Sequence, residues 1–266
     1  YRSAIEKKPD FFPNNYFALG SVQYKKSRYS EAKTSFEKFL TYPKITSTLA
    51  ARARQMVSNC AYADSAIQHP VPFKPINMGD SINTADQEYF PCITADGKTF
   101  LFTRRLKKTN EYGIKKEQED FYVSRFEKGH WTKAKPLDEL NTNGNEGAAN
   151  LSADGQYIFF IGCEEMDGYP DGREKGQGSC DIYISKKNGE KYGRVRNLGS
   201  PINTGAWESQ PSFSSDGRTL YFIRAIKGSD GRTQRDIYVT KINDNSSWTD
   251  PVPLSNLINT PNDEMS

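Results

Sequence analysis

Few residues in this sequence have the types and spacing of a catalytic centre. The 266-residue chain contains two histidines, His69 and His130, and neither belongs to a Ser–His–Asp arrangement or to a set of metal ligands. The nucleophile-elbow pattern Gly-x-Ser-x-Gly and the phosphate-loop pattern of nucleotide-binding proteins do not occur. We therefore expect a protein that is not an enzyme and that uses no cofactor and no metal.

The most regular charged residues are glutamates that recur at one position. Each follows an Asn-Thr pair, five residues after the asparagine: Asn83 and Glu88, Asn141 and Glu146, Asn203 and Glu208, Asn259 and Glu264. In a ring of repeats, Glu88, Glu146 and Glu208 could line the mouth of a central channel and hold a cation. A glutamate at a repeated position can instead accept hydrogen bonds from backbone or Ser/Thr groups and tie repeats together. The sequence favours this structural role.

These glutamates open a unit of about sixty residues that occurs three times. In each unit a first strand leads to an Asp-Gly turn (Asp96-Gly97, Asp154-Gly155 and Asp216-Gly217) and then to an apolar second strand. The predicted second strands are Thr99–Phe102, Tyr157–Ile161 and Thr219–Ile223, and the third strands begin at Asp120, Asp181 and Asp236. Four short strands per unit are typical of β-propeller blades, and propellers usually have four to eight of them. We expect further blades beyond Ser266.

The loops predicted between second and third strands differ in charge. Residues 104–119 contain six basic and three acidic side chains, whereas residues 163–180 contain five acidic and two basic ones. Opposite charges on adjacent blades suit a protein-docking surface, although ordinary solvated loops have similar compositions. The candidate partner-binding residues are Arg104, Arg105, Lys107, Lys108, Lys115, Lys116, Glu164, Glu165, Asp167 and Asp171.

Two of the four cysteines are predicted to form a disulfide. Alignment of the repeats places Cys163 with Arg105 and Cys180 with Glu119, an oppositely charged pair expected to face each other across the neck of a loop. A bond between Cys163 and Cys180 would indicate an oxidising compartment such as the periplasm. Cys60 and Cys92 are predicted to be buried thiols.

The first 68 residues have helical rather than strand periodicity. Three helices are predicted between Asn14 and Ile67, with breaks near Ser27 and Pro43. The spacing of five residues matches the packing positions of a tetratricopeptide repeat: Tyr16, Leu19, Gly20, Ala32 and Phe36. A plain three-helix bundle is the alternative.

Composition and charge place further limits on the chain. Prolines 70, 72 and 75 indicate an extended linker, which divides the sequence into a helical module at 1–68, a linker at 69–76 and propeller blades at 77–266. The predicted fold class is therefore α + β with two domains, tetratricopeptide-like repeats followed by an incomplete all-β propeller. The net charge of +3 is too small to indicate nucleic-acid binding. Because the chain starts at Tyr1, we expect it to be a piece of a longer protein.

The repeat motifs resemble those of one protein family. Asn-Glu-Gly-Ala at 145–148, Ser-Ala-Asp-Gly at 152–155, Cys-Asp-Ile-Tyr at 180–183 and Trp-Glu-Ser-Gln-Pro-Ser at 207–212 are similar to segments of OmpA-family lipoproteins of the Bacteroidota. Those proteins join tetratricopeptide repeats, a TolB-type propeller of WD-like repeats and a peptidoglycan-binding domain.

The resemblance implies a non-enzymatic scaffold on the periplasmic side of the outer membrane. Its partners would be envelope proteins, including those of the type IX secretion system. Attachment to peptidoglycan and to the membrane would come from a domain and a lipid anchor outside this chain. The alternative is a protein whose propeller binds a glycan or peptidoglycan fragment on the face that carries the Asn-Thr segments.

Overall fold

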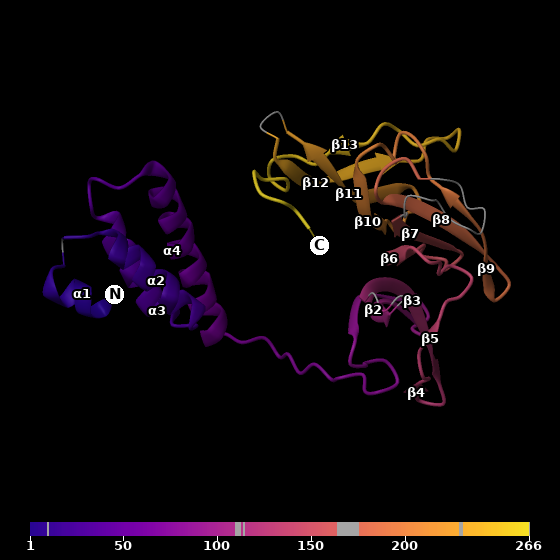
Figure 1. The fold of residues 1–266 in the computed structure, drawn as a ribbon, viewed down its shortest axis with the longest axis horizontal. Helices are drawn as coiled ribbons and strands as arrows, with labels where there is room; N and C mark the ends of the chain where they lie inside the picture. Colours follow the sequence, from indigo (N-terminus) through magenta and orange to yellow (C-terminus); the bar gives the residue numbers. More distant parts are fainter. Residues whose placement is uncertain (10, 110–112, 114, 164–175, 229–230, 266) are drawn as a thin grey trace. The chain divides into compact units, whose positions relative to one another are not determined.

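The chain divides into two compact units, Tyr1–Ile76 and Asn77–Ser266. The computed structural model describes residues 1–266 except residues 10, 110–112, 114, 164–175, 229–230 and 266 (Figure 1). Residues 69–76 contain neither helix nor strand, and all of them are exposed. Each unit has its own hydrophobic core and is described separately.

Four helices form the first unit, which we call the helical unit. They are α1 (Arg2–Lys7), α2 (Asn14–Lys25), α3 (Tyr29–Leu40) and α4 (Ser47–Gln68). Helix α3 packs against both α2 and α4. The core of this unit consists of five buried side chains: Ala32, Phe36, Phe39, Ala53 and Cys60. Gly20 lets α2 approach α3, because a Cβ at this position would lie 3.0 Å from the ring of Phe36.

The predicted fold class, a tetratricopeptide-like helical domain followed by a propeller, is wrong. The chain is mostly β, with three antiparallel sheets, and 21% of the described residues are helical. The helices do not repeat a unit of two matched helices, because α1 has six residues and α4 has 22, whereas α2 and α3 have 12 each. The predicted spacing therefore reflects one close helix pair, α2 and α3, in which Tyr16, Gly20, Ala32 and Phe36 meet.

The second unit, which we call the β-unit, contains three antiparallel sheets in chain order. The first comprises β1 (Gln87–Ile93), β2 (Thr99–Thr109), β3 (Lys115–Glu127), β4 (His130–Trp131) and β5 (Lys135–Pro136). The second comprises β6 (Asn145–Leu151), β7 (Tyr157–Cys163), β8 (Asp181–Asn188) and β9 (Lys191–Asn197). The third comprises β10 (Trp207–Phe213), β11 (Thr219–Lys227), β12 (Thr233–Lys241) and β13 (Val252–Pro253). Three consecutive meanders of this kind give a β-propeller-like unit.

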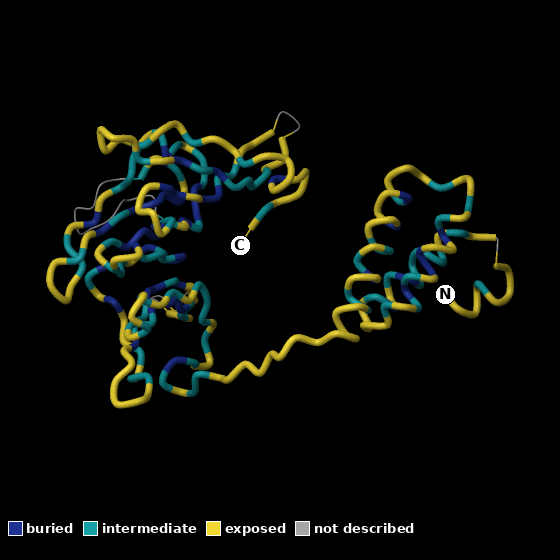
Figure 2. The backbone as a smooth tube through the Cα atoms, turned by 180° about the vertical axis from the view of Figure 1, so that it is seen from behind, coloured by how far each residue is buried: buried dark blue, intermediate teal, exposed yellow. Residues whose placement is uncertain are grey.

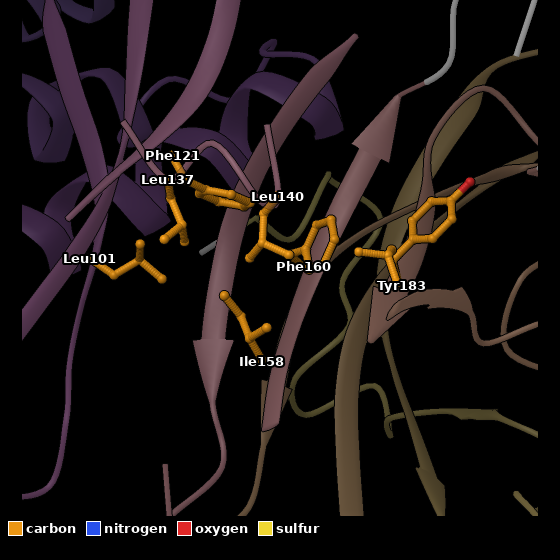
Figure 3. Packing of buried hydrophobic residues seen from close by; sticks show 8 residues of the cluster. Leu101, Phe121, Leu137, Leu140, Ile158, Phe160 and Tyr183 are labelled. Atoms are coloured by element: carbon orange, nitrogen blue, oxygen red, sulfur yellow. The ribbon is translucent and has the colours of Figure 1, made fainter. Parts of the chain in front are cut away.

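The sheets pack face to face through alternating apolar residues. One cluster joins the first and second sheets, and Figure 3 shows its side chains Leu101, Phe121, Leu137, Leu140, Ile158, Phe160 and Tyr183. A second cluster joins the second and third sheets and includes Phe159, Ile182, Leu220 and Phe222. The buried segments of Figure 2 follow these strands, so apolar burial between sheets holds the unit together.

The Asp-Gly turns are equivalent in all three sheets. Gly97, Gly155 and Gly217 have φ values of 68°, 67° and 68°, which a side chain would strain. The preceding aspartates accept hydrogen bonds from a Thr or Ser hydroxyl and from the backbone N–H two residues on. These bonds, the hydroxyl first, lower the pKa values of Asp96, Asp154 and Asp216.

This pKa shift predicts an acid dependence of stability. Because each folded pKa lies below the unfolded value, the turns stabilise the fold above about pH 4 and lose this contribution as the pH falls through the folded pKa. Asparagine at positions 96, 154 and 216 should therefore flatten the fall in stability below about pH 4. Urea unfolding at a series of pH values measures this slope, and equal slopes in the wild type and the triple variant would contradict the prediction.

Candidate functional site

The repeated asparagines join each sheet to the connection that follows it. Asn203 accepts a hydrogen bond from Ile182 N at 2.9 Å and donates one to Ile182 O at 2.8 Å. Asn141 makes the same pair of bonds to Phe121, and Asn259 makes them to Ile237. The side-chain amide of each of these three asparagines thus pairs with the backbone of the third strand of the preceding sheet.

The repeated glutamates complete this connection from the first strand of the next sheet. Glu208 is fully buried and accepts hydrogen bonds from Thr204 N at 3.1 Å and Thr204 Oγ1 at 2.7 Å. The guanidinium of Arg224 donates to the same carboxylate at 2.9 Å and to Ile202 O at 2.6 Å. In the first sheet, Arg104 pairs with Glu88 in the same way.

These hydrogen bonds are of the structural kind that the sequence favoured over an open channel mouth that holds a cation. Glu146 and Glu208 are fully buried, and a threonine donates to each of the three carboxylates, including Glu88. The repeat spacing brought these residues to equivalent positions, but it did not indicate that Arg104 and Arg224 pair with Glu88 and Glu208. Glu88, Glu146 and Glu208 therefore tie the sheets together and do not form an open cation site.

The predicted basic loop is also corrected, because most of it is β-structure. Strand β2 continues to Thr109 and β3 begins at Lys115, so Arg104, Arg105, Lys107, Lys108, Lys115 and Lys116 lie on paired strands. Arg104 is 7% exposed and donates a hydrogen bond to Glu88. Lys107, Lys108, Lys115 and Lys116 are exposed on an extension of the hairpin, which we call the basic extension.

Arg105 is held by its neighbours at the base of this extension. It pairs with Glu119 at 2.8 Å, and its guanidinium carbon lies 5.4 Å from the ring centroid of Tyr89. Tyr89 donates a hydrogen bond to the same carboxylate. Burial, followed by the interaction with Glu119, raises the pKa of Tyr89. Arg105 is therefore a structural residue, and the exposed cations of the extension lie beyond it.

The structure joins Cys163 to Cys180 by a disulfide. Their Cα atoms are 4.1 Å apart, and they occupy the register positions that Arg105 and Glu119 occupy in the first sheet. Cys60 is a buried free thiol and Cys92 is a half-buried one, and burial raises the pKa of both. The acidic residues predicted within the disulfide-closed loop, Glu164, Glu165, Asp167 and Asp171, lie outside the described residues.

Removal of this disulfide has a predictable cost. The bond closes a loop of 17 residues, for which the chain-entropy relation gives about 3 kcal/mol. Cys163→Ser/Cys180→Ser should therefore lower the free energy of unfolding of the β-unit by about 3 kcal/mol in urea. The wild type should titrate two thiols after denaturation without reductant. Four titratable thiols, or equal stability of the two proteins, would contradict this.

The helical unit carries an exposed cavity that the sequence pattern did not reveal. A cavity of about 620 Å³ lies between α4, the end of α2 and the start of α3, lined in part by Tyr24, Tyr29, Tyr62 and Ile67. Tyr62 is 79% exposed and Ile67 is 60% exposed. Of the predicted packing residues, Leu19 does not join the main core and lines a smaller cavity near α1. Tyr62 lies on the exposed face of α4, where helical spacing gives no signal.

Among the described residues, no three His, Cys, Asp or Glu side chains gather closely enough to hold a metal ion. His69 follows α4 and His130 lies in β4, and both are exposed. Within the same residues, none of the helices combines the length and apolarity needed to cross a membrane.

Neither protein-family models nor curated proteins match the chain. Solved structures match it at 11% identity. They include the tricorn protease (TM-score 0.39, covering 60% of this chain and 18% of that one) and a Mycobacterium tuberculosis puromycin-hydrolyzing peptidase (0.40, 64% and 23%). A third is a Penicillium chrysogenum α-L-arabinanase complexed with arabinobiose (0.40, 65% and 50%). The chain thus spans half or less of the length of each.

These matches correct the expectation that the chain is not an enzyme. All three solved structures are enzymes. The expectation relied on the lack of a linear catalytic motif, and catalytic side chains can be placed on a fold at positions that no linear motif records. The matches assign no activity to this chain.

Proposed function

We propose that this chain is a scaffold that binds other proteins of the cell envelope. The observation that carries the proposal is the tyrosine-lined cavity of the helical unit. Tyr62 and Ile67 are exposed at its edge, and Tyr24 and Tyr29 stack edge to face within it at 5.2 Å. Tyrosine is enriched at protein interfaces because it combines a large apolar ring with a hydroxyl group.

The basic extension supports a second contact with a partner. Its four exposed lysines lie on two paired strands, which fix their backbone positions relative to the sheet, and Lys108 also pairs with Asp120 at 3.3 Å. Fixed cations steer and select an acidic partner through long-range attraction. The helical cavity would supply an apolar anchor, and the extension would supply charge selectivity.

The compartment and complex rest on the sequence resemblance. We place the chain with OmpA-family lipoproteins of the Bacteroidota, of which PorE belongs to the type IX secretion machinery, on the periplasmic side of the outer membrane. The disulfide supports an oxidising compartment. Attachment to peptidoglycan and to the membrane would come from parts outside this chain.

Site-specific photo-crosslinking in the whole protein tests the proposal. A benzophenone amino acid replaces Tyr62 in one variant and Phe73 in the control, because Phe73 is 80% exposed but lies outside the cavity. We expect crosslinks to an envelope protein from position 62 and none to that protein from position 73. Equal crosslinking from both positions, or no protein captured at position 62, would refute the proposal.

A further inference from the structure

A second cavity lies within the β-unit, between the second and third sheets. Its volume is about 790 Å³, within the range of small-molecule sites. The turns at Asp154 and Asp216 both line it, which places it at the end of the first strands opposite the Asn-Thr segments. It is therefore distinct from the face on which the sequence suggested a glycan.

Aromatic rings form one wall of this cavity. Phe159 is buried, and its ring centroid lies 4.5 Å from that of Phe213. Trp248 meets Phe213 edge to face at 6.4 Å and is half-buried, and Tyr157 is also half-buried. Because Phe159 and Phe213 belong to the core between the sheets, the aromatic wall is held by the fold.

Negatively and positively charged side chains line the rest of the cavity. Asp154 and Asp216 are exposed, and hydroxyl and backbone hydrogen bonds to each carboxylate lower its pKa, so both are ionised at neutral pH. Arg196, on β9, is exposed in the same cavity. The Asn197 side chain bonds to Asp181, Gly199 and Asn203, so this part of the wall is fixed.

An equivalent cavity between the first and second sheets provides an internal comparison. It measures about 390 Å³ and is lined by polar and small side chains, including those of Asp96, Thr99 and Arg125. Both cavities have the turn aspartates, since the turns repeat. The aromatic wall belongs to the larger cavity. Repetition of the scaffold therefore explains the carboxylates but not the larger volume or the four aromatic rings.

We infer that the cavity between the second and third sheets binds a neutral sugar unit of a glycan. A sugar ring has an apolar C–H face that can lie on an aromatic ring, and its hydroxyls both donate and accept hydrogen bonds. The carboxylates would accept from these hydroxyls, and Arg196 would donate to them. Two carboxylates disfavour an anion, whereas Arg196 disfavours a cation. The polar rim disfavours a purely apolar ligand.

Calorimetric titration of the whole protein with neutral tetrasaccharides tests this inference. The probes are the β-1,4-linked tetramers of glucose, N-acetylglucosamine and xylose. Asp216→Asn removes the charge but keeps an oxygen that can accept the turn hydrogen bonds, and Arg196→Ala removes the donor. Asp96→Asn makes the same change in the equivalent turn outside the cavity.

We expect at least one tetramer to bind. Asp216→Asn and Arg196→Ala should each weaken that binding about tenfold or more, because each removes a charge-assisted hydrogen bond. Asp96→Asn should leave it unchanged. The inference is overturned if no tetramer binds, if all three variants bind equally to the wild type, or if a lysine-rich peptide competes and a tetramer does not. These results are independent of crosslinking at Tyr62, so the two proposals can fail separately.

Discussion

Replacing Glu208 with alanine is expected to lower the free energy of unfolding of the β-unit by about 3–5 kcal/mol. Glu208 is fully buried, and the side chain of Arg224 is only 12% exposed. Without the carboxylate, the buried guanidinium loses its counter-charge, and Thr204 N and Oγ1 lose their acceptor. Urea unfolding followed by the fluorescence of the three tryptophans, all of which lie in this unit, measures the loss.

Two further variants separate the buried pair from a general effect of charge removal. Glu190→Ala removes a carboxylate that is 83% exposed and pairs with Arg125, so it should cost at most about 1 kcal/mol. Adding Arg224→Met to Glu208→Ala should recover part of the loss, because the unpaired cation is then gone. A loss below about 1 kcal/mol for Glu208→Ala would contradict the structural role of the glutamates.

Replacing Phe36 with alanine should unfold the helical unit and leave the β-unit folded. Phe36 is fully buried, packs beside Gly20 and meets Phe17 edge to face at 5.4 Å. Removing a buried phenylalanine costs about 3–5 kcal/mol, which is comparable with the whole stability of so small a unit. Hydrogen exchange should show loss of protection in α2, α3 and α4 and unchanged protection in the sheets.

Tyr62→Ala is the matched control for this prediction. Tyr62 is 79% exposed on α4, so its removal should change the stability of the unit by no more than about 0.5 kcal/mol. Retained protection of α2 and α3 in Phe36→Ala would mean that the small aromatic core does not determine the stability of the unit.

The repeat was visible in the sequence because residues of the same types meet the same local backbone requirements in each of the three units. The Asp-Gly pairs mark turns that need a positive φ, and the asparagines mark the bonds that join each sheet to the next connection. Cys163 and Cys180 could be paired because the repeat places Arg105 and Glu119 opposite each other. Residues that interact locally and recur at a fixed spacing can therefore be identified from the sequence alone.

Features that depend on contacts distant in sequence were not readable. The pairing of Glu208 with Arg224 could not be predicted, because nothing in the segment around Glu208 indicates that an arginine of the next strand lies beside its carboxylate. The length of β2 was underestimated because charged residues can pair on an extended hairpin without an apolar pattern. Equal spacing along α2 and α3 suggested a repeat, although the lengths of α1 and α4 exclude matched helix pairs. Tyr62 lies on an exposed face, which periodicity does not constrain.

The most direct test of the scaffold proposal is the affinity of the whole protein for the partner captured at position 62. Tyr62→Ser removes the most exposed ring of the cavity, whereas Phe73→Ser removes an equally exposed ring outside it. If the cavity anchors the partner, Tyr62→Ser should weaken binding about 30-fold, the loss of roughly 2 kcal/mol expected for a central aromatic, and Phe73→Ser should change it less than about twofold. Equal affinities of the wild type and Tyr62→Ser would contradict the account.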